Sequence, residues 1–368
     1  MNPPAAMGRR DFSARMVGLA ATPPLAGLLS RGQLDEAARL VQAQVDAGRL
    51  RAAALLVRHV KTTFARAFGE ARSPETIFLI ASITKPMTAA GVMVLADRGE
   101  LALQDPVHKF IPEFDDGDRK QVTVEHLLTH TSGLPDMLPE NAELRKRHAP
   151  LEEFVERAIR TPLLFKPGSK YSYQSMGILL ASEIARRITR MPFPKFLGDQ
   201  VFKPLGMTRT ALGLGRFKIA ETASCQVEQA APEGGGVADA DWNWNSPYWR
   251  GLGVPWGGAH STCGDITAFL ESFLHPEGKV LKPETAASMV ADHTPGLAEH
   301  RGLGFAVGSR SFGAKSSPRT FGHGGSTGTI ACADPRSGLT CVLLTTLPAR
   351  VSQALLLDPV CDVVSGVA

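Results

Sequence analysis

The sequence predicts an α+β fold in which helices flank an antiparallel sheet and an all-helical subdomain is inserted between its strands. Two strand-like runs precede residue 70, and three more follow residue 300. Between them lies a stretch of short helical patterns that proline and glycine interrupt. We therefore expect the early and late strands to share one sheet, with the helical block inserted between them.

The chain begins with one predicted helix and a hairpin. Apolar residues recur at helical spacing from Leu34 to Ala47, and Gly48 ends the helix. The runs 52–57 and 62–68 are joined by a short polar turn, which is typical of two antiparallel strands.

The helical block and the late strands follow in order. The helical patterns span residues 124–130, 151–160 and 176–189. The late strand patterns span residues 303–307, 329–333 and 339–345. We expect one catalytic domain over 32–368, with an α/β lobe from about 32–100 and 256–368 and a helical lobe from about 101–255.

Residues 1–31 resemble an export signal of the twin-arginine type. Arg9-Arg10 precedes a mostly small and apolar run from Met16 to Leu29, which Pro23-Pro24 interrupts. The favoured prediction is a periplasmic or secreted protein, and the alternative is a cytoplasmic chain with an irregular N-terminus. No later stretch approaches the roughly 18 apolar residues of a spanning helix, so no membrane role is expected beyond the signal.

Composition argues against several other classes. The 40 basic residues nearly balance the 36 acidic ones, so nothing calls for a nucleic-acid partner. The five cysteines lack C-x-x-C spacing, and we expect no metal site and no cofactor. His126 and His130 lie four residues apart in a helical pattern, but the glutamate of the zinc-protease motif is missing between them.

Ser82 and Lys85 form the first candidate catalytic pair. Residues three apart share one face of a helix, so the hydroxyl and the amine come within hydrogen-bond reach. Pro86 is tolerated only in a first helical turn, which places the helix start near Ser82. The alternative is a serine N-cap with an exposed lysine.

Two later segments supply further candidates. Tyr173 and Ser175 end a loop just before a predicted helix, where a phenol can face a cleft. The alternative is that Tyr173 packs on the core and Ser175 caps the helix. His323-Gly324-Gly325 leads into a strand, and glycine allows close backbone approach at a cleft edge, although any tight turn also uses glycine.

Together, Ser82-Ile83-Thr84-Lys85, Tyr173-Gln174-Ser175 and His323-Gly324-Gly325 resemble the three motifs of the serine β-lactamases and penicillin-binding proteins. Stretches 99–107, 126–135 and 257–262 look like the class C branch, which also holds carboxylesterases, D-aminopeptidases and D,D-peptidases. The resemblance covers the chain from about residue 34 to its end. It implies a β-lactamase/transpeptidase-like fold and a serine hydrolase.

The resemblance also implies roles for individual residues. Ser82 attacks a carbonyl and forms an acyl-enzyme that water hydrolyses. Lys85 takes the proton if burial and positive neighbours lower its pKa from about 10.4, and Tyr173 is the other candidate base or relay. The backbone N–H groups of Ser82 and Ser326 are expected to bind the oxyanion.

Two positions depart from the lactam-active pattern. Ser175 stands where an asparagine holds the substrate amide, and His323 stands where a lysine assists the tyrosine and the substrate carboxylate. These departures favour a short-chain ester or a similar acyl substrate without an obligatory carboxylate. If protonation of His323 assists Tyr173, activity should change between about pH 5.5 and 7.5.

All four tryptophans fall in one proline- and glycine-broken segment, residues 241–257. They suit an apolar acyl pocket, or alternatively they pin a long loop to the core. Trp256 is the predicted site contact, and it joins the other predicted substrate-binding residues, Ser175, His323, Gly324 and Gly325.

The predicted function is therefore a serine hydrolase, an esterase or weak β-lactamase. The alternatives are a D-aminopeptidase or D,D-peptidase, or a catalytically silent binding protein. The expected substrates are small esters, lactams or short peptides.

Overall fold

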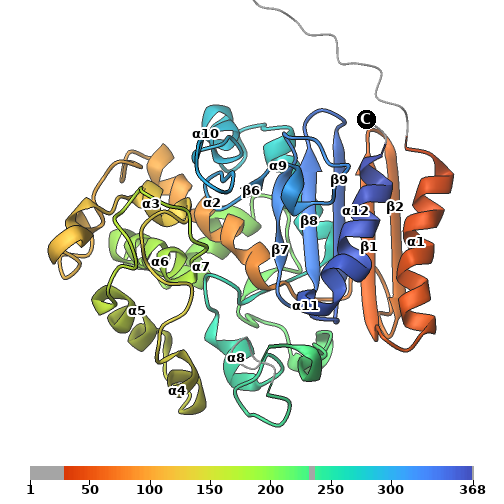
Figure 1. Ribbon diagram of the computed structural model, residues 1–368, viewed down its shortest axis with the longest axis horizontal. Coiled ribbons are helices and arrows are strands. Elements are labelled where there is room, and N and C mark those ends of the chain that lie inside the picture. The colour runs from red at the N-terminus through yellow and green to blue at the C-terminus, as the bar shows by residue number, and fades with distance from the viewer. Residues whose placement is uncertain (1–28, 232–236, 367–368) are drawn as a thin grey trace, which may run out of the picture.

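The computed structural model describes residues 29–231 and 237–366 and confirms the predicted α+β fold (Figure 1). Most of the segment predicted as an export signal, residues 1–28, lies outside the described residues, so export stays a prediction. Within the described ranges, no helix combines the length and the apolar character that crossing a bilayer requires.

The central sheet joins the two ends of the chain. Its strand order is β2-β1-β9-β8-β7-β6, with every neighbouring pair antiparallel. The strands are β1 (Ala52–His59), β2 (Thr62–Gly69), β6 (Ala306–Val307), β7 (Phe321–Gly325), β8 (Thr329–Asp334) and β9 (Leu339–Thr345). A small second sheet has the order β3 (Phe78–Leu79), β5 (Ala259–Ser261) and β4 (Ala211–Leu212). The early and late strands thus share one sheet, as expected.

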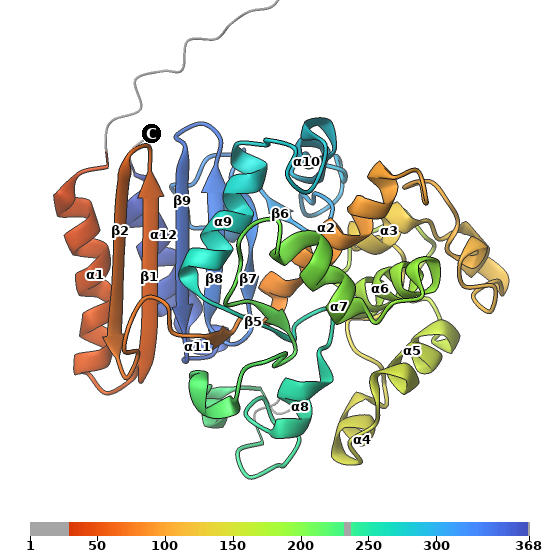
Figure 2. The same cartoon turned by 180° about the vertical axis from the view of Figure 1, so that it is seen from behind.

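Both faces of the central sheet are covered by helices. Helices α1 (Arg31–Asp46) and α12 (Asp358–Ser365) lie on one face, and α9 (Cys263–Leu274) lies on the other (Figures 1 and 2). Successive side chains of a strand point to opposite faces, so Leu343 enters the core beneath α1 and α12 while Val342 and Leu344 enter the core on the α9 side. Every residue of β9 is therefore buried.

The helical block packs beside the β7 end of the sheet (Figure 1). Its central element is α2 (Thr84–Asp97). This helix is buried from Thr84 to Leu95, as expected of a helix that is apolar around most of its circumference. The other helices are α3 (Val124–Leu128), α4 (Asn141–Lys146), α5 (Leu151–Arg160), α6 (Ser175–Thr189), α7 (Phe193–Leu197), α8 (Pro247–Leu252), α10 (Pro283–Met289) and, after β9, α11 (Ala349–Ser352).

Two elements are shorter than the sequence patterns predict. The strand expected over 303–307 is reduced to β6, because Gly304 has φ +79° and packs against Ala89 of α2. The helix expected over 124–130 ends at Leu128, and His130 has φ 62°, so His126 and His130 do not share one helical face.

Candidate active site

Ser82 lies in a short 3₁₀ turn, Ala81–Ile83, that connects strand β3 to helix α2. Ala81 has φ 46°, a left-handed conformation that an alanine adopts only under constraint. The turn is held by Thr84, whose hydroxyl donates to the Ala81 carbonyl at 2.6 Å and accepts from the Ala259 amide at 3.1 Å. This turn presents the Ser82 side chain to a cavity.

Lys85 is fully buried one turn further along, on the same side as Ser82. Its Nζ donates to Ser82 Oγ at 3.0 Å and to the Trp256 carbonyl at 2.9 Å. Burial lowers the pKa of this amine from 10.5 to about 7; nearby Asp136 raises it and Arg301 lowers it further. A substantial fraction of the amine is therefore uncharged at neutral pH and able to accept a proton.

Tyr173 precedes helix α6 and lies against Lys85, with Nζ 4.6 Å from the centre of its ring. Its ring also packs on His130, with the ring centroids 4.8 Å apart. Burial raises the pKa of the phenol well above its ordinary value, while the Ser82 hydroxyl acts in the opposite direction. The phenol is therefore protonated where Lys85 titrates, and it suits a proton donor or relay better than a base.

The segment after β7 brings Ser326 to the cavity that Ser82 lines. Thr327 donates to the Leu79 carbonyl at 2.7 Å and Thr329 donates to the Ile80 carbonyl at 3.0 Å, which fixes this segment against the Ser82 turn. Gly325 is required for this approach, because a Cβ there would lie 2.5 Å from the Ile80 carbonyl oxygen. Among the backbone hydrogen bonds of the described turns and loops, neither the Ser82 nor the Ser326 amide donates to a carbonyl.

The cavity has a volume of about 370 Å³. The predicted residues Ser82, Tyr173, Ser175, Trp256 and Ser326 all line it. Trp244 and Trp249 line it as well, whereas Trp242 is buried behind the wall. The tryptophan segment therefore supplies an apolar wall and at the same time packs on the core.

Ser175 is not free to contact a substrate as an asparagine would. Its hydroxyl donates to Asp136 Oδ1 at 2.6 Å, and its amide donates to the Asp136 carbonyl at 3.2 Å. Asp136 itself is exposed and lines the cavity.

His323 lies beside the cavity and not among its lining residues, and the same holds for Gly324 and Gly325. The His323 ring is buried with its centroid 6.0 Å from that of Tyr173, and its Nδ1 lies 2.6 Å from the Gly324 carbonyl oxygen. Burial, reinforced by Arg301 and Lys85, holds the pKa of His323 well below 6.5. The expected titration of His323 between about pH 5.5 and 7.5 is therefore wrong, because the ring is already neutral in that range.

Three charged residues in or beside the cavity were not predicted from the sequence. Asp136 directly follows the stretch Leu134-Pro135, and that proximity was the only local signal. Arg145 of α4 lines the cavity, and Arg301 lies behind Tyr173 with its guanidinium carbon 5.7 Å from the ring centre. Neither arginine lies in one of the three sequence motifs. The fold brings both to the site from other segments of the chain.

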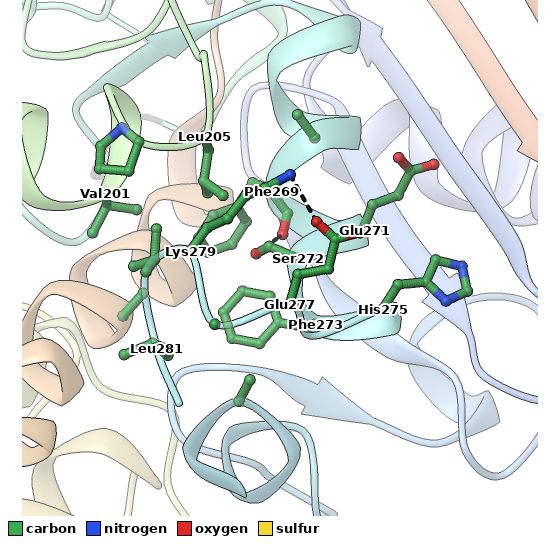
Figure 3. A pocket seen from close by; sticks show the side chains of 16 residues that line it. Val201, Leu205, Phe269, Glu271, Ser272, Phe273, His275, Glu277, Lys279 and Leu281 are labelled. Atoms are coloured by element: carbon green, nitrogen blue, oxygen red, sulfur yellow. Dashed lines mark hydrogen bonds and ion pairs between the residues drawn. The ribbon is translucent and has the colours of Figure 1, made fainter. Parts of the chain in front are cut away.

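A second hollow of about 240 Å³ lies between α9, α2 and the segment 275–281 (Figure 3). Phe269, Leu205 and Leu281 are among its walls, and Ser272 and Lys279 also line it. The Ser272 hydroxyl donates to the Phe269 carbonyl of its own helix, and Lys279 pairs with Glu277 at 2.8 Å. This hollow therefore has a serine and a lysine, but each already has a local partner.

Metal ligation has no support in the described ranges, where no group of three or more histidine, cysteine or carboxylate side chains is placed to hold an ion. His126 caps the start of α3 through Thr123, and His130 accepts from the Gln174 amide at 3.2 Å. Both histidines thus have structural partners.

Comparison with known proteins identifies relatives over most of the chain. A family model described as Beta-lactamase matches residues 37–358. Esterase EstB of Burkholderia gladioli is 32% identical over 338 residues, which is 80% of this chain and 85% of that protein. A protein of Escherichia coli (strain K12) named "Putative D-alanyl-D-alanine carboxypeptidase" is 26% identical over 363 residues, 86% of this chain and 82% of its own.

The fold is also found among solved structures. One is titled "EstCE1, a hydrolase with promiscuous acyltransferase activity"; its TM-score is 0.76 at 22% identity, over 91% of this chain and 98% of that chain. D-amino acid amidase from Ochrobactrum anthropi SV3 has a TM-score of 0.70 at 23% identity, over 90% of this chain and 98% of that chain. At these identities the likeness shows the shared fold.

Proposed function

The chain belongs to the beta-lactamase family and is a serine hydrolase, and we propose that it cleaves small carboxylic esters through an acyl-enzyme on Ser82. The observation that carries this proposal is the hydrogen bond of 3.0 Å between Lys85 Nζ and Ser82 Oγ, together with the pKa of about 7 for that amine. A serine hydroxyl needs an adjacent base, and an amine of that pKa is one at neutral pH.

Acylation would proceed as follows. Ser82 Oγ bonds to the ester carbonyl carbon while Lys85 Nζ takes its proton, and the amides of Ser82 and Ser326 bind the resulting oxyanion. The carbon–oxygen bond to the alcohol then breaks. The proton on Lys85 passes to the departing alkoxide, with the Tyr173 phenol as relay. In deacylation, water attacks the acyl carbon while Lys85 takes its proton. The bond between the acyl carbon and Ser82 Oγ then breaks, Lys85 returns the proton to Ser82 Oγ, and the carboxylic acid leaves.

Two observations favour esters over lactams and peptides. The Ser175 hydroxyl is engaged by Asp136, and neutral His323 supplies no cation at the β7 position where the lactam-active motif that it resembles has a lysine. The relative named an esterase is also 32% identical over most of the chain. The second candidate function is hydrolysis of D-amino-acid peptides, which the named carboxypeptidase relative favours.

The test is hydrolysis of 4-nitrophenyl acetate, 4-nitrophenyl butyrate and nitrocefin by the wild type, Ser82→Ala and Ser272→Ala. Ser272→Ala is the matched control, because that serine lies in the hollow of Figure 3. We expect ester turnover and an acyl adduct by intact mass, both retained in Ser272→Ala and both lost in Ser82→Ala. No Ser82-dependent turnover of the esters would overturn the esterase proposal, and D-alanyl peptides would then be the next substrates.

A further inference from the structure

Arg145 is a buried cation in the wall of the catalytic cavity. Its side chain is only 1% exposed, yet it lines the same cavity as Ser82. The guanidinium carbon lies over two aromatic rings, 3.9 Å from the ring centre of Trp249 and 5.0 Å from that of Trp242. Such stacking stabilises the cation through the ring faces and leaves its N–H edges to find other partners.

Those edges are largely unsatisfied. In the described parts of the chain Arg145 forms no ion pair, its one hydrogen bond is from Nη2 to the Trp242 carbonyl at 3.1 Å, and its buried Nε has no acceptor. Burial lowers the pKa of the guanidinium to about 10, so it is still charged at neutral pH. Asp136, also in the cavity wall, is hydrogen-bonded to Ser175.

Arg250 shows what a structural buried arginine looks like in the same region. It is also 1% exposed, but its N–H groups reach the Trp244 and Ala223 carbonyls and the side chains of Thr222 and Asn245. Arg250 is therefore satisfied by the protein itself. The N–H groups of Arg145 are not satisfied in this way. An unpaired buried cation is destabilising unless a ligand supplies the missing acceptors.

We propose that Arg145 binds a carboxylate of the substrate, so that the preferred esters carry a carboxylate group remote from the scissile ester carbonyl. Guanidinium and carboxylate groups match in geometry and form charge-assisted hydrogen bonds, which are stronger in a cavity shielded from water. The walls formed by Trp249 and Trp256 would contact the apolar part of such a substrate. This inference rests on the proposed esterase function and adds its substrate class.

The test compares matched esters with and without a carboxylate. On the acyl side the pair is 4-nitrophenyl hydrogen adipate and 4-nitrophenyl hexanoate; on the alcohol side it is 4-acetoxybenzoate and its methyl ester. For the wild type we expect kcat/KM to favour the charged member of one pair by about tenfold or more. The pair that shows the preference identifies whether Arg145 binds a carboxylate on the acyl side or on the alcohol side of the ester.

Variants then assign that preference to one residue. Arg145→Met should reduce the preference by about tenfold through KM for the charged ester, so that the charged ester loses about tenfold more activity than the neutral one. Arg145→Lys should retain part of the preference. Arg250→Gln is the control, and it should lower turnover of both members in proportion, together with the melting temperature.

The outcomes separate this inference from the proposed function. Ser82-dependent hydrolysis without preference for either charged ester would overturn the role of Arg145 and leave the esterase intact. A proportional loss on both members of a pair in Arg145→Met would also overturn it. If Arg145→Met does not fold, Arg145→Lys decides: a preference equal to that of the wild type would overturn the role of the guanidinium. In the wild type, 1 M NaCl should reduce the preference. No turnover of any of the four esters would overturn the esterase proposal itself.

Discussion

The catalytic cavity and the hollow of Figure 3 contain similar side chains in different electrostatic settings. Each is partly apolar, and each has a serine and a lysine in or beside its wall. In the hollow, Lys279 is well exposed and paired with Glu277. At the catalytic cavity, Lys85 is completely buried without an ion pair among the described residues, and Arg145 is short of acceptors. Burial of basic side chains without an ion pair among the described residues, more than size or apolar lining, therefore distinguishes the proposed catalytic cavity from the hollow.

Removal of the buried amine should have the largest effect. Lys85→Met is expected to lower kcat/KM for 4-nitrophenyl butyrate by roughly 10³-fold, because Ser82 loses the group that takes its proton. The matched variant Lys279→Met should leave the rate within about twofold, because Lys279 is exposed and paired. Similar losses in both variants would remove the distinction between the two lysines.

Removal of the Tyr173 hydroxyl should have the next largest effect. Tyr173→Phe is expected to lower kcat by roughly 10²-fold, since the ring stays while the proton relay is lost. Tyr248→Phe is the control, because that hydroxyl donates to the Ala149 carbonyl. Pre-steady-state measurement of acylation should show the loss. An unchanged acylation rate in Tyr173→Phe would leave Lys85 to serve both steps alone.

The pH dependence of the wild type should follow Lys85. Because the pKa of the amine is about 7 and only the uncharged form accepts a proton, kcat/KM should fall about tenfold per pH unit on the acid side and level off above about pH 8. His323→Gln should keep the same midpoint, since that ring is neutral throughout this range. If the midpoint moved in His323→Gln, the fall of kcat/KM on the acid side would have to be assigned to His323.

The smallest effect is expected from Arg301. This residue lowers the pKa of Lys85, so Arg301→Gln should raise that pKa and shift the acid limb toward higher pH. Activity at pH 7 should fall by roughly threefold and recover at pH 9. Arg216→Gln, on an exposed segment, is the control. A loss that persists at pH 9 would indicate that Arg301 positions Tyr171, to which it donates at 2.5 Å, and does not act through charge.

The fold and the contact between Ser82 and Lys85 were predictable because their signals are local. The spacing of Ser82 and Lys85 fixes their contact within one turn, and the strand runs are long and apolar. Arg145 and Arg301 were not predictable, because an arginine in a polar stretch looks like any solvent-exposed one until the fold buries it. The placement of His323 depended on the packing of β7, which no local pattern reports.

The hydrogen bonds from Thr327 and Thr329 to the Ser82 turn join residues 248 and 249 positions apart in the chain. Closing so long a loop is entropically unfavourable until the strands that support it have paired. A chain still being synthesised already carries Ser82 and Lys85, but it lacks the Ser326 amide until the last strands are made and docked. The proposed ester hydrolysis is therefore a property of the finished fold, and a partly folded chain carries Ser82 without the cavity and the second amide that the proposal requires.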